Sequence, residues 1–543
     1  MMKTSAANLS PLTRLDAFLA ALLGLASLTL YVRTLAPGLL YGDSGEFQTV
    51  VYSLGMTHPT GYPVYVLIGR LFTLLPLGDP SWRVNLFSAV LGALTVACVY
   101  LIVRLLSSWR LAAATAAITL AVTPLFWYFS VITELYVPAC ACLSGVLLFL
   151  LLWRQTGKWP WLAASALLGG LSLGVHSSVA LAAPGALVYL ALTTLTPRPL
   201  PKRERGQAWV SAIGGALLGV ALAFAAFLTL DAINAEAGYY HATVERSLSV
   251  WGMNEADFDS PLERLQFLYA AHQFNYAMFS DPAETMPFLS GIYGEVLGMV
   301  FAPLSLALMG IGLIGLFFRH WRAGLLLLLG WGVGMVFITN YDIFDVVVFF
   351  VPTFVFLVLW IGTGLGVLMQ VLAWGVKRIG REKGAVPAAA LFGIVVLGLT
   401  VQFWGGMAAE AWKSKAVVFM RGTEFEEYPY PLDDPQAVHS EAQALVDAVE
   451  DNAIVFLGWD LLFPCYYVSH LEQDRTGLDF HEAYPQEGIS EISESMADYI
   501  ESNLAARPVY FLERPNGQQM HRFDIRLVDR DGISLYQVVG MRP

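Results

Sequence analysis

Long apolar runs separated by short charged segments dominate the sequence from residue 15 to residue 407. The runs are about 18 to 25 residues long, the length with which an α-helix crosses the hydrocarbon core of a bilayer. A helix satisfies its own backbone hydrogen bonds in lipid, so the pattern predicts a polytopic α-helical membrane protein. Eleven spans are expected, near 15–35, 84–106, 111–130, 135–153, 160–175, 178–196, 208–230, 291–318, 323–339, 345–372 and 386–407.

The apolar stretch at 62–76 is expected to behave differently from the spans. It is short, carries Arg70 at its middle and ends at Pro76, which favours a helix that lies on or dips into the membrane interface. Counting it as a span would move the cation-rich loops that follow to the outer side, against the positive-inside rule. The pattern therefore predicts a cytoplasmic N-terminus and a long first outer loop with interfacial helices, roughly at 37–83.

The distribution of charged residues predicts a second domain after the membrane-spanning part. The 543 residues are 56% hydrophobic and carry a formal net charge of −12, yet the part after Ala408 holds 10 Lys or Arg against 24 Asp or Glu. This acidic tail alternates strand-like runs such as "AIVFLGW", "PVYFLER" and "ISLYQVV" with helical stretches. We expect a transmembrane domain at 1–407 and a small extracytoplasmic α/β domain at 408–543.

The composition does not support nucleic-acid binding, a disulfide framework or a zinc site made of cysteines. Basic residues do not cluster among exposed aromatics, so nucleic acid is not an expected partner. The four cysteines have no spacing typical of a disulfide framework or a zinc site.

Acids and histidines gather on the outer side in the predicted topology. Placing an ionisable side chain inside the membrane costs free energy, so such residues usually mark a functional site. The outer side receives the loop at 231–290 and the residues Asp43, Glu46, His58, Glu134, His176, Asp342 and Asp345.

The segment "GDSGEF" places Asp43 and Glu46 within four residues of each other in the first outer loop. Ser44 is expected to cap a helix that starts near Gly45, with Glu46 in its first turn and Asp43 just before it. Ordinary capping would explain such a pair in an exposed loop. The "HPTGYP" that follows fixes a tight backbone, and further acids arrive from other outer loops, so a site is the competing interpretation.

Three further segments carry candidate residues beside apolar helices. Glu134 in "TELY" is expected either to pair with a cation or to act on a ligand. His176 in "LSLGVHSS" stands near a helix end, where a structural hydrogen bond competes with ligand binding. In "TNYDIFDVV", Asp345 can cap the next helix, whereas Asp342 beside Tyr341 has no such explanation.

The 231–290 loop contains His241, Arg246, His272 and several aromatic residues. Arginine binds phosphate oxygens and aromatic rings stack on sugar faces, so these residues suit a phosphate or a sugar. Amphipathic surface helices explain the same segment equally well.

Together, "GDSGEF", "HPTGYP", "TELY", "GVHSS" and "NYDIFDVVVFFVPTF" resemble a multi-spanning membrane family long catalogued as a domain of unknown function. That family is now grouped with transmembrane-type protein O-mannosyltransferases in the glycosyltransferase C (GT-C) superfamily. The resemblance covers essentially the whole membrane domain. The tail segment "NAIVFLGWDLLFPCYY" is loosely similar to one in many bacterial members, of whose acidic residues only Asp460 remains here.

The resemblance implies a GT-C-like enzyme of a bacterial inner membrane that moves a sugar, with mannose one candidate, from a polyprenyl-phosphate-sugar donor. The acceptor would be a hydroxyl of a protein, glycan or lipid on the outer face. By the same resemblance Asp43 is the catalytic base and Glu46 the second acid of the pair. Such a reaction needs a base because the acceptor hydroxyl must lose its proton as it attacks the anomeric carbon.

The phosphate leaving group calls for cationic or hydrogen-bonding partners, for which Arg246, His58 and His176 are candidates. Attack opposite the phosphate would invert the anomeric centre. No DxD-type motif is present, so no cofactor is expected, although Asp43, Glu46 and Asp342 can jointly hold Mg²⁺. The residues expected to bind substrate are His58, Tyr62, Glu134, His176, Arg246, Tyr341 and Asp342.

A transporter or lipid flippase that uses the outer-face carboxylates is the alternative function. Transporters usually show repeated halves with charges near the middle of the membrane. The sequence has no evident internal repeat and its acids lie at one face, which favours the enzyme.

Overall fold

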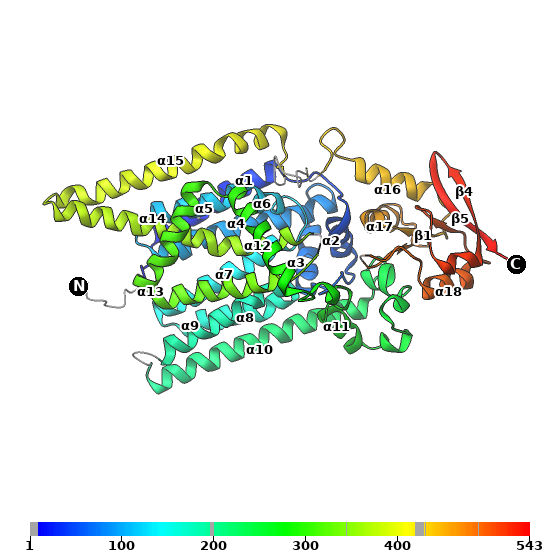
Figure 1. Ribbon diagram of the computed structural model, residues 1–543, viewed down its shortest axis with the longest axis horizontal. Coiled ribbons are helices and arrows are strands. Elements are labelled where there is room, and N and C mark those ends of the chain that lie inside the picture. Colours follow the sequence, from blue (N-terminus) through cyan, green and yellow to red (C-terminus); the bar gives the residue numbers. More distant parts are fainter. Residues whose placement is uncertain (1–8, 196–199, 344, 419–427, 429, 487) are drawn as a thin grey trace. The chain divides into compact units, whose positions relative to one another are not determined.

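The computed structural model describes the chain except for residues 1–8, 196–199, 344, 419–427, 429 and 487 (Figure 1). Contacts between residues divide it into two compact units, each built from three separate stretches of sequence. Unit 1 comprises Met1–Leu35, Ser88–Ala223 and Ala277–Pro429. Unit 2 comprises Ala36–Phe87, Phe224–Tyr276 and Tyr430–Pro543. The predicted domain boundary near residue 407 stays a prediction.

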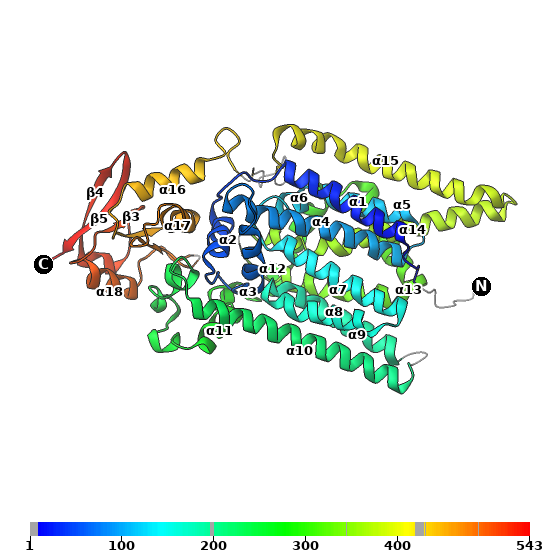
Figure 2. The same cartoon turned by 180° about the vertical axis from the view of Figure 1, so that it is seen from behind.

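The described residues of unit 1 form helices and no strand, apart from an isolated β-bridge between Met278 and Tyr341. Figures 1 and 2 show α7, α8 and α9 lying side by side in it. Its helices are α1 (Arg14–Arg33), most of α4 (Pro80–Leu106), α5 (Arg110–Val122), α6 (Pro124–Phe129), α7 (Tyr136–Thr156), α8 (Trp159–Leu171), α9 (Ala183–Leu195), most of α10 (Lys202–Ile233), α12 (Pro282–Val300), α13 (Pro303–Ile338), α14 (Thr353–Arg378) and α15 (Glu382–Ser414).

Eight helices of the described chain are long and apolar enough to cross a membrane. The predicted polytopic helical fold is thereby confirmed, while several boundaries differ from expectation. The run at 111–130 is divided at Pro124 into α5 and α6, and the run at 291–318 is divided at Pro303 into α12 and α13. Proline has no backbone N–H and therefore starts helices more readily than it continues them. The expected interfacial helix is α3 (Pro63–Thr73), whose 11 residues are too few for a span.

Small residues let α13 and α14 approach closely in unit 1. A Cβ added at Gly312 would lie 1.8 Å from the Trp360 carbonyl oxygen, and one at Gly364 would lie 2.0 Å from the Leu308 carbonyl oxygen. Helices in lipid gain stability from such close backbone packing. The two glycines therefore set the distance between the helices.

Unit 2 combines the first predicted outer loop, the 224–276 region and the C-terminal α/β domain. Its sheet has the order β2-β1-β3-β5-β4, with β1 parallel to β2 and β3, and β5 antiparallel to β3 and β4. The strands are β1 (Ile454–Leu457), β2 (Asp479–Glu482), β3 (Val509–Phe511), β4 (Phe523–Arg530) and β5 (Ile533–Met541), and the helices are α2 (Gly42–Ser53), α3, α11 (Pro261–Tyr269), α16 (Ala437–Asp447), α17 (Trp459–Tyr466) and α18 (Glu494–Asn503).

Helix α2 packs directly against α17 of the C-terminal domain. A Cβ at Gly45 would lie 3.1 Å from the Pro464 ring, so the absence of a side chain allows the contact. The Thr49 hydroxyl donates a hydrogen bond to the Phe463 carbonyl oxygen at 3.0 Å. The segment predicted as the first outer loop thus packs on the C-terminal α/β part, whose five-stranded sheet with helices is confirmed.

Candidate functional site

Asp43, Glu46 and His58, three of the residues predicted for the site, lie together in unit 2. Glu46 is 0% exposed and receives two contacts from His58, the backbone N–H at 2.8 Å and the ring Nδ1 at 2.5 Å. On the other side of the ring, Nε2 lies 3.9 Å from Oδ2 of Asp43, whose side chain is 36% exposed. The imidazole therefore stands between a buried acid and an accessible one.

The electrostatics of this group follow from burial. Desolvation raises the pKa of Glu46, while the neighbouring His58 acts in the opposite direction. An ionised carboxylate only accepts hydrogen bonds, so ionised Glu46 places a proton on Nδ1 of His58. Glu46 thereby fixes the ring with Nε2 directed toward Asp43.

The expected capping of α2 is wrong. The helix begins at Gly42, Tyr41 is its N-cap without a side-chain hydrogen bond, and Ser44 is buried inside the helix. Gly42 has φ +58°, a conformation that favours glycine and carries the chain from extended backbone into the helix. Asp43 therefore occupies the first turn, where the helix dipole stabilises a carboxylate, and Glu46 is a buried partner of His58 rather than a cap.

Trp459 and Glu482 complete the surroundings of the acid pair, and the sequence did not single out either. The Trp459 Nε1–H donates to Oδ1 of Asp43 at 2.7 Å. Glu482 is 6% exposed, accepts a hydrogen bond from the Thr243 hydroxyl at 3.0 Å, and has its pKa raised to about 8 by burial and by Glu46.

Both residues lie at the carboxyl ends of parallel strands. Trp459 follows β1 after one glycine, and Glu482 ends β2. Ligands bind at this edge of open α/β sheets as a rule. The position of Trp459 at the carboxyl end of the strand-like run "AIVFLGW" was therefore the signal that could have identified it.

Tyr62 supports the His58 ring instead of standing free. Its hydroxyl donates to the Pro59 carbonyl oxygen at 2.7 Å, and its ring lies edge-on to His58 with centroids 5.3 Å apart. Phe47 and Trp459 lie on His58 with centroid distances of 5.5 and 5.9 Å. Aromatic contacts of this kind restrict the imidazole.

Unit 1 gathers other predicted site residues around Phe349. The centroid distances to this ring are 5.9 Å for His176 and 5.3 Å for Tyr341, and Tyr136 also lies 5.3 Å away. Nδ1 of His176 accepts the Ser178 backbone N–H at 3.2 Å and contacts its hydroxyl at 2.7 Å. His176 thus caps the following 3₁₀ helix, the structural role weighed for it from the sequence.

The remaining predicted residues have surroundings of their own. In unit 1, Glu134 is partly buried between α6 and α7, and Asp342 is exposed with its backbone N–H bonded to the Ala277 carbonyl oxygen at 2.9 Å. In unit 2, the Arg246 guanidinium lies 4.5 Å from the centroid of the Tyr499 ring and 3.9 Å from Glu245. The side chain of His272 lies outside the described residues.

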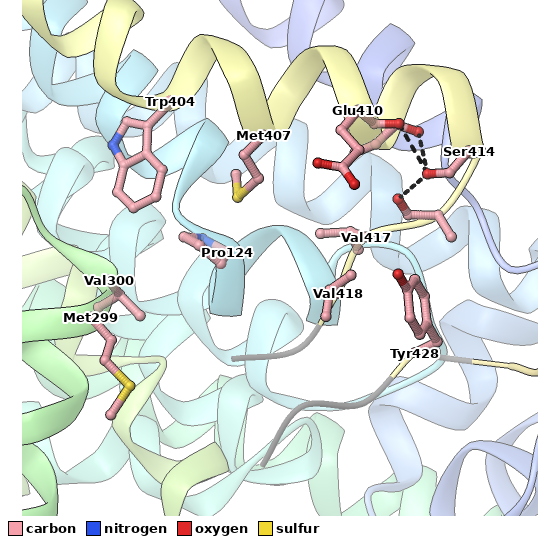
Figure 3. A pocket seen from close by; sticks show the side chains of 12 residues that line it. Pro124, Met299, Val300, Trp404, Met407, Glu410, Ser414, Val417, Val418 and Tyr428 are labelled. Atoms are coloured by element: carbon pink, nitrogen blue, oxygen red, sulfur yellow. Dashed lines mark hydrogen bonds between the residues drawn. The ribbon is translucent and has the colours of Figure 1, made fainter. Parts of the chain in front are cut away.

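Unit 1 also contains a mainly apolar cavity of about 260 Å³ (Figure 3). Trp404, Met407 and Glu410 reach it from α15, and Met299 from α12. None of the residues predicted for the site lines this cavity.

Comparisons with known proteins bear on the segment that holds the acid pair. Residues 43–198 match the family model of the Protein O-mannosyl-transferase TMEM260 N-terminal domain. The chain is also similar to curated protein O-mannosyl-transferases. The mouse Protein O-mannosyl-transferase TMEM260 is 35% identical over 107 residues, and its Dictyostelium discoideum counterpart is 27% identical over 118 residues. The resemblance predicted from the motifs is confirmed there.

These matches cover only part of either protein. They span 20% and 21% of this chain, and 15% and 14% of the mouse and Dictyostelium proteins. The activity of the whole relatives therefore enters below as a proposal.

Solved structures share the fold over most of the chain. ArnT from Cupriavidus metallidurans bound to undecaprenyl phosphate superposes with a TM-score of 0.50 at 13% identity, covering 95% of this chain and 97% of ArnT. The Archaeoglobus fulgidus oligosaccharyltransferase gives 0.50 at 13% identity, covering 93% of this chain and 70% of that one. The expected GT-C-like fold is confirmed.

Proposed function

We propose that this protein is a membrane glycosyltransferase that moves a hexose, with mannose the first candidate, from a polyprenyl-phosphate-linked donor to a hydroxyl acceptor. The observation that carries the proposal is the Asp43 carboxylate, which is accessible, oriented by Trp459 and backed by the His58–Glu46 pair. The match to an O-mannosyl-transferase family model begins at this residue. The solved ArnT of the same fold, bound to undecaprenyl phosphate, supports a lipid-phosphate donor.

Asp43 is the base in the proposed reaction. Trp459 occupies Oδ1, which leaves Oδ2 to accept the proton of the acceptor hydroxyl. As that proton moves, the hydroxyl oxygen forms a bond to the anomeric carbon of the sugar and the bond from that carbon to the phosphate oxygen breaks. The electron pair leaves with the polyprenyl phosphate, and the configuration at the anomeric carbon inverts.

His58 and Glu46 position this base. Nε2 of His58 faces Oδ2 of Asp43 at 3.9 Å, and buried Glu46 contacts Nδ1 on the other side of the ring at 2.5 Å. This arrangement, with one accessible acid and one buried acid, suits a base that must be held in position before the acceptor arrives.

Other expected roles remain part of the proposal. Arg246, Glu134, His176, Tyr341 and Asp342 are candidate substrate ligands. The chemistry would take place at the outer, periplasmic side of a bacterial inner membrane, and the acceptor would be a protein, a glycan or a lipid.

The test is transfer of radiolabelled mannose from polyprenyl-phosphate mannose to endogenous acceptors in membranes that contain the protein. Asp43→Asn keeps the Oδ1 acceptor for Trp459 but cannot take a proton at the other position. We expect a loss of at least about 10²-fold in rate, the contribution of a positioned base, with unchanged expression. Asp433→Asn, at an exposed acid of the same unit, is the matched control and should retain activity.

Transfer by Asp43→Asn within a few-fold of the unaltered protein would remove Asp43 from the base role. Uptake of a lipid-linked sugar into vesicles without any glycosylated product would instead favour the transporter alternative.

A further inference from the structure

A second cluster of ligand-type side chains lies in unit 2, on the π-helical turn 240–244 and on β2, the strand that ends at Glu482. His241 stands on a short π-helical turn, Tyr240–Val244, while Asp479 and His481 belong to β2. Residues two apart on a strand point to the same face. Each of the three offers one potential metal-ligand atom, and these atoms all lie within 4.8 Å of one another.

The distances inside the cluster suit a shared ion. Nε2 of His241 lies 3.5 Å from Oδ1 of Asp479, and the two imidazole centroids are 5.2 Å apart. Two imidazoles bound to one tetrahedral Zn²⁺ with Zn–N of about 2.1 Å place their ring centres about 5 Å apart. Small side-chain rotations would bring the three ligand atoms to bonding distance.

In each of the three side chains, the polar atom that would not bind the ion already has a partner. Nδ1 of His241 lies 3.6 Å from Glu245, the other oxygen of Asp479 pairs with Arg507, and Nδ1 of His481 donates to the His241 carbonyl oxygen at 3.1 Å. Metal-binding histidines and carboxylates are typically oriented by such partners on the atom that does not bind the ion. Nε2 of His481 therefore carries the lone pair, which accepts a long hydrogen bond from the Tyr499 hydroxyl at 3.4 Å, and a bound ion would replace this contact.

One of the potential ligand atoms makes no hydrogen bond to the described residues. Nε2 of His241 is buried and has no hydrogen-bond partner within the part of the chain that the structure describes. Buried polar atoms are nearly always satisfied, so an exception calls for an explanation. An ion pair between His241 and Asp479 would use two of the three residues and would not require His481, which is fully buried, to face them.

We propose that His241, Asp479 and His481 bind a divalent transition-metal ion of the Zn²⁺ class. Two imidazole nitrogens and one carboxylate oxygen form a ligand set that Zn²⁺ uses with a fourth position for water. The ion ties the 240–244 turn to β2. Thr243 and Glu482, which bond to each other at 3.0 Å, extend from the same two elements, so the ion also holds Glu482 in place beside the acid pair.

The test measures metal binding and does not depend on transferase activity. The full chain, purified with a tag that contains no histidine and washed with chelator, is titrated with Zn²⁺ by calorimetry, and bound metal is counted by mass spectrometry. We expect about one Zn²⁺ per chain. His241→Ala and His481→Ala should lower the affinity at least tenfold, since even the partners of metal ligands contribute 10–100-fold, to order of magnitude.

His439→Ala is the matched control, because His439 is a partly exposed histidine of the same unit that pairs with Glu472 at 2.7 Å. It should leave the stoichiometry and the affinity unchanged. Zn²⁺ should raise the melting temperature of the unaltered chain and of His439→Ala but not of His481→Ala.

Equal binding by the unaltered chain and by His481→Ala, or no binding by either, would overturn the proposal. If the histidine variants do not fold, the visible spectrum of Co²⁺ bound to the unaltered chain decides the matter. A tetrahedral spectrum with nitrogen ligands supports the site, and the spectrum of hydrated Co²⁺ refutes it.

Discussion

The Glu46–His58 pair offers a direct measure of what burial does to a contact between a carboxylate and an imidazole. Unit 2 contains a natural counterpart, Glu472–His439. The two contacts have similar lengths, 2.5 and 2.7 Å, but the side chain of Glu46 is 0% exposed and that of Glu472 is 37% exposed. Replacing each glutamate by glutamine removes the same charge from two different environments.

The expected cost can be worked out contact by contact. In Glu46→Gln the amide oxygen still accepts the His58 backbone N–H, which lies at 2.8 Å. A charge-assisted hydrogen bond to the ring is replaced by a neutral one, and the difference between the two kinds is about 1–2 kcal/mol. In Glu472→Gln the exposed pair contributes about 0–1 kcal/mol before the change, so the loss should be smaller.

The assay is reversible unfolding of the purified protein in mixed micelles, followed by tryptophan fluorescence. We expect Glu46→Gln to lower the free energy of unfolding by more than Glu472→Gln does. The combination of Glu46→Gln with His58→Ala should cost less than the sum of the two single changes, by about 0.5–3 kcal/mol, because the residues are in contact. Equal losses at both pairs, together with strict additivity, would refute the argument from burial.

Three further changes test other parts of the structure. The Arg264 guanidinium donates two hydrogen bonds, at 2.7 and 2.8 Å, to the Asp231 carboxylate, whose side chain is 3% exposed. Arg264→Ala leaves this carboxylate buried without its partner and should lower the free energy of unfolding by about 3–5 kcal/mol in the same assay. A loss below about 1 kcal/mol would show the pair to be dispensable. Gly312→Ala places a methyl group against the backbone of α14, whereas the methyl group of Gly310→Ala meets open space. Only Gly312→Ala should lower the free energy of unfolding, by roughly 1–3 kcal/mol or more, the cost of overpacking. Equal yields of folded protein from the two variants would contradict the close approach of α13 and α14. Burial raises the pKa of Glu482 to about 8, so the folded chain holds a proton that the unfolded chain releases. The free energy of unfolding should therefore fall as the pH rises from about 5 to 8. The melting temperature of Glu482→Gln should fall less steeply over this range, and identical slopes would exclude this group as the cause.

The sequence predicted the elements whose signals are local. Apolar runs identified the membrane-spanning helices, and three strand-like runs correspond to β1, β3 and β5. The short strand β2 and the more polar β4 carried no comparable signal. The start of α2 was predicted three residues late, because serine is a common N-cap while the positive φ of Gly42 is visible only in the folded chain.

The candidate site shows the same division between local and distant signals. Asp43, Glu46 and His58 lie within 16 residues of sequence and were predicted together. Trp459 contacts Asp43 across 416 positions, and His481 contacts His241 across 240. No spacing motif links residues so far apart, so one sequence read by itself does not reveal such pairs.

The contact between Asp43 and Trp459 also constrains the order of events during biosynthesis. The acid emerges from the ribosome and reaches the bilayer with the first helices, but its tryptophan partner is made 416 residues later. Translation at about 5–20 residues per second separates the two by tens of seconds. Throughout that interval α2 lacks its packing partner α17. The enzyme we propose is therefore assembled only when its last domain has been made, and a prematurely terminated chain would occupy the membrane without an oriented base.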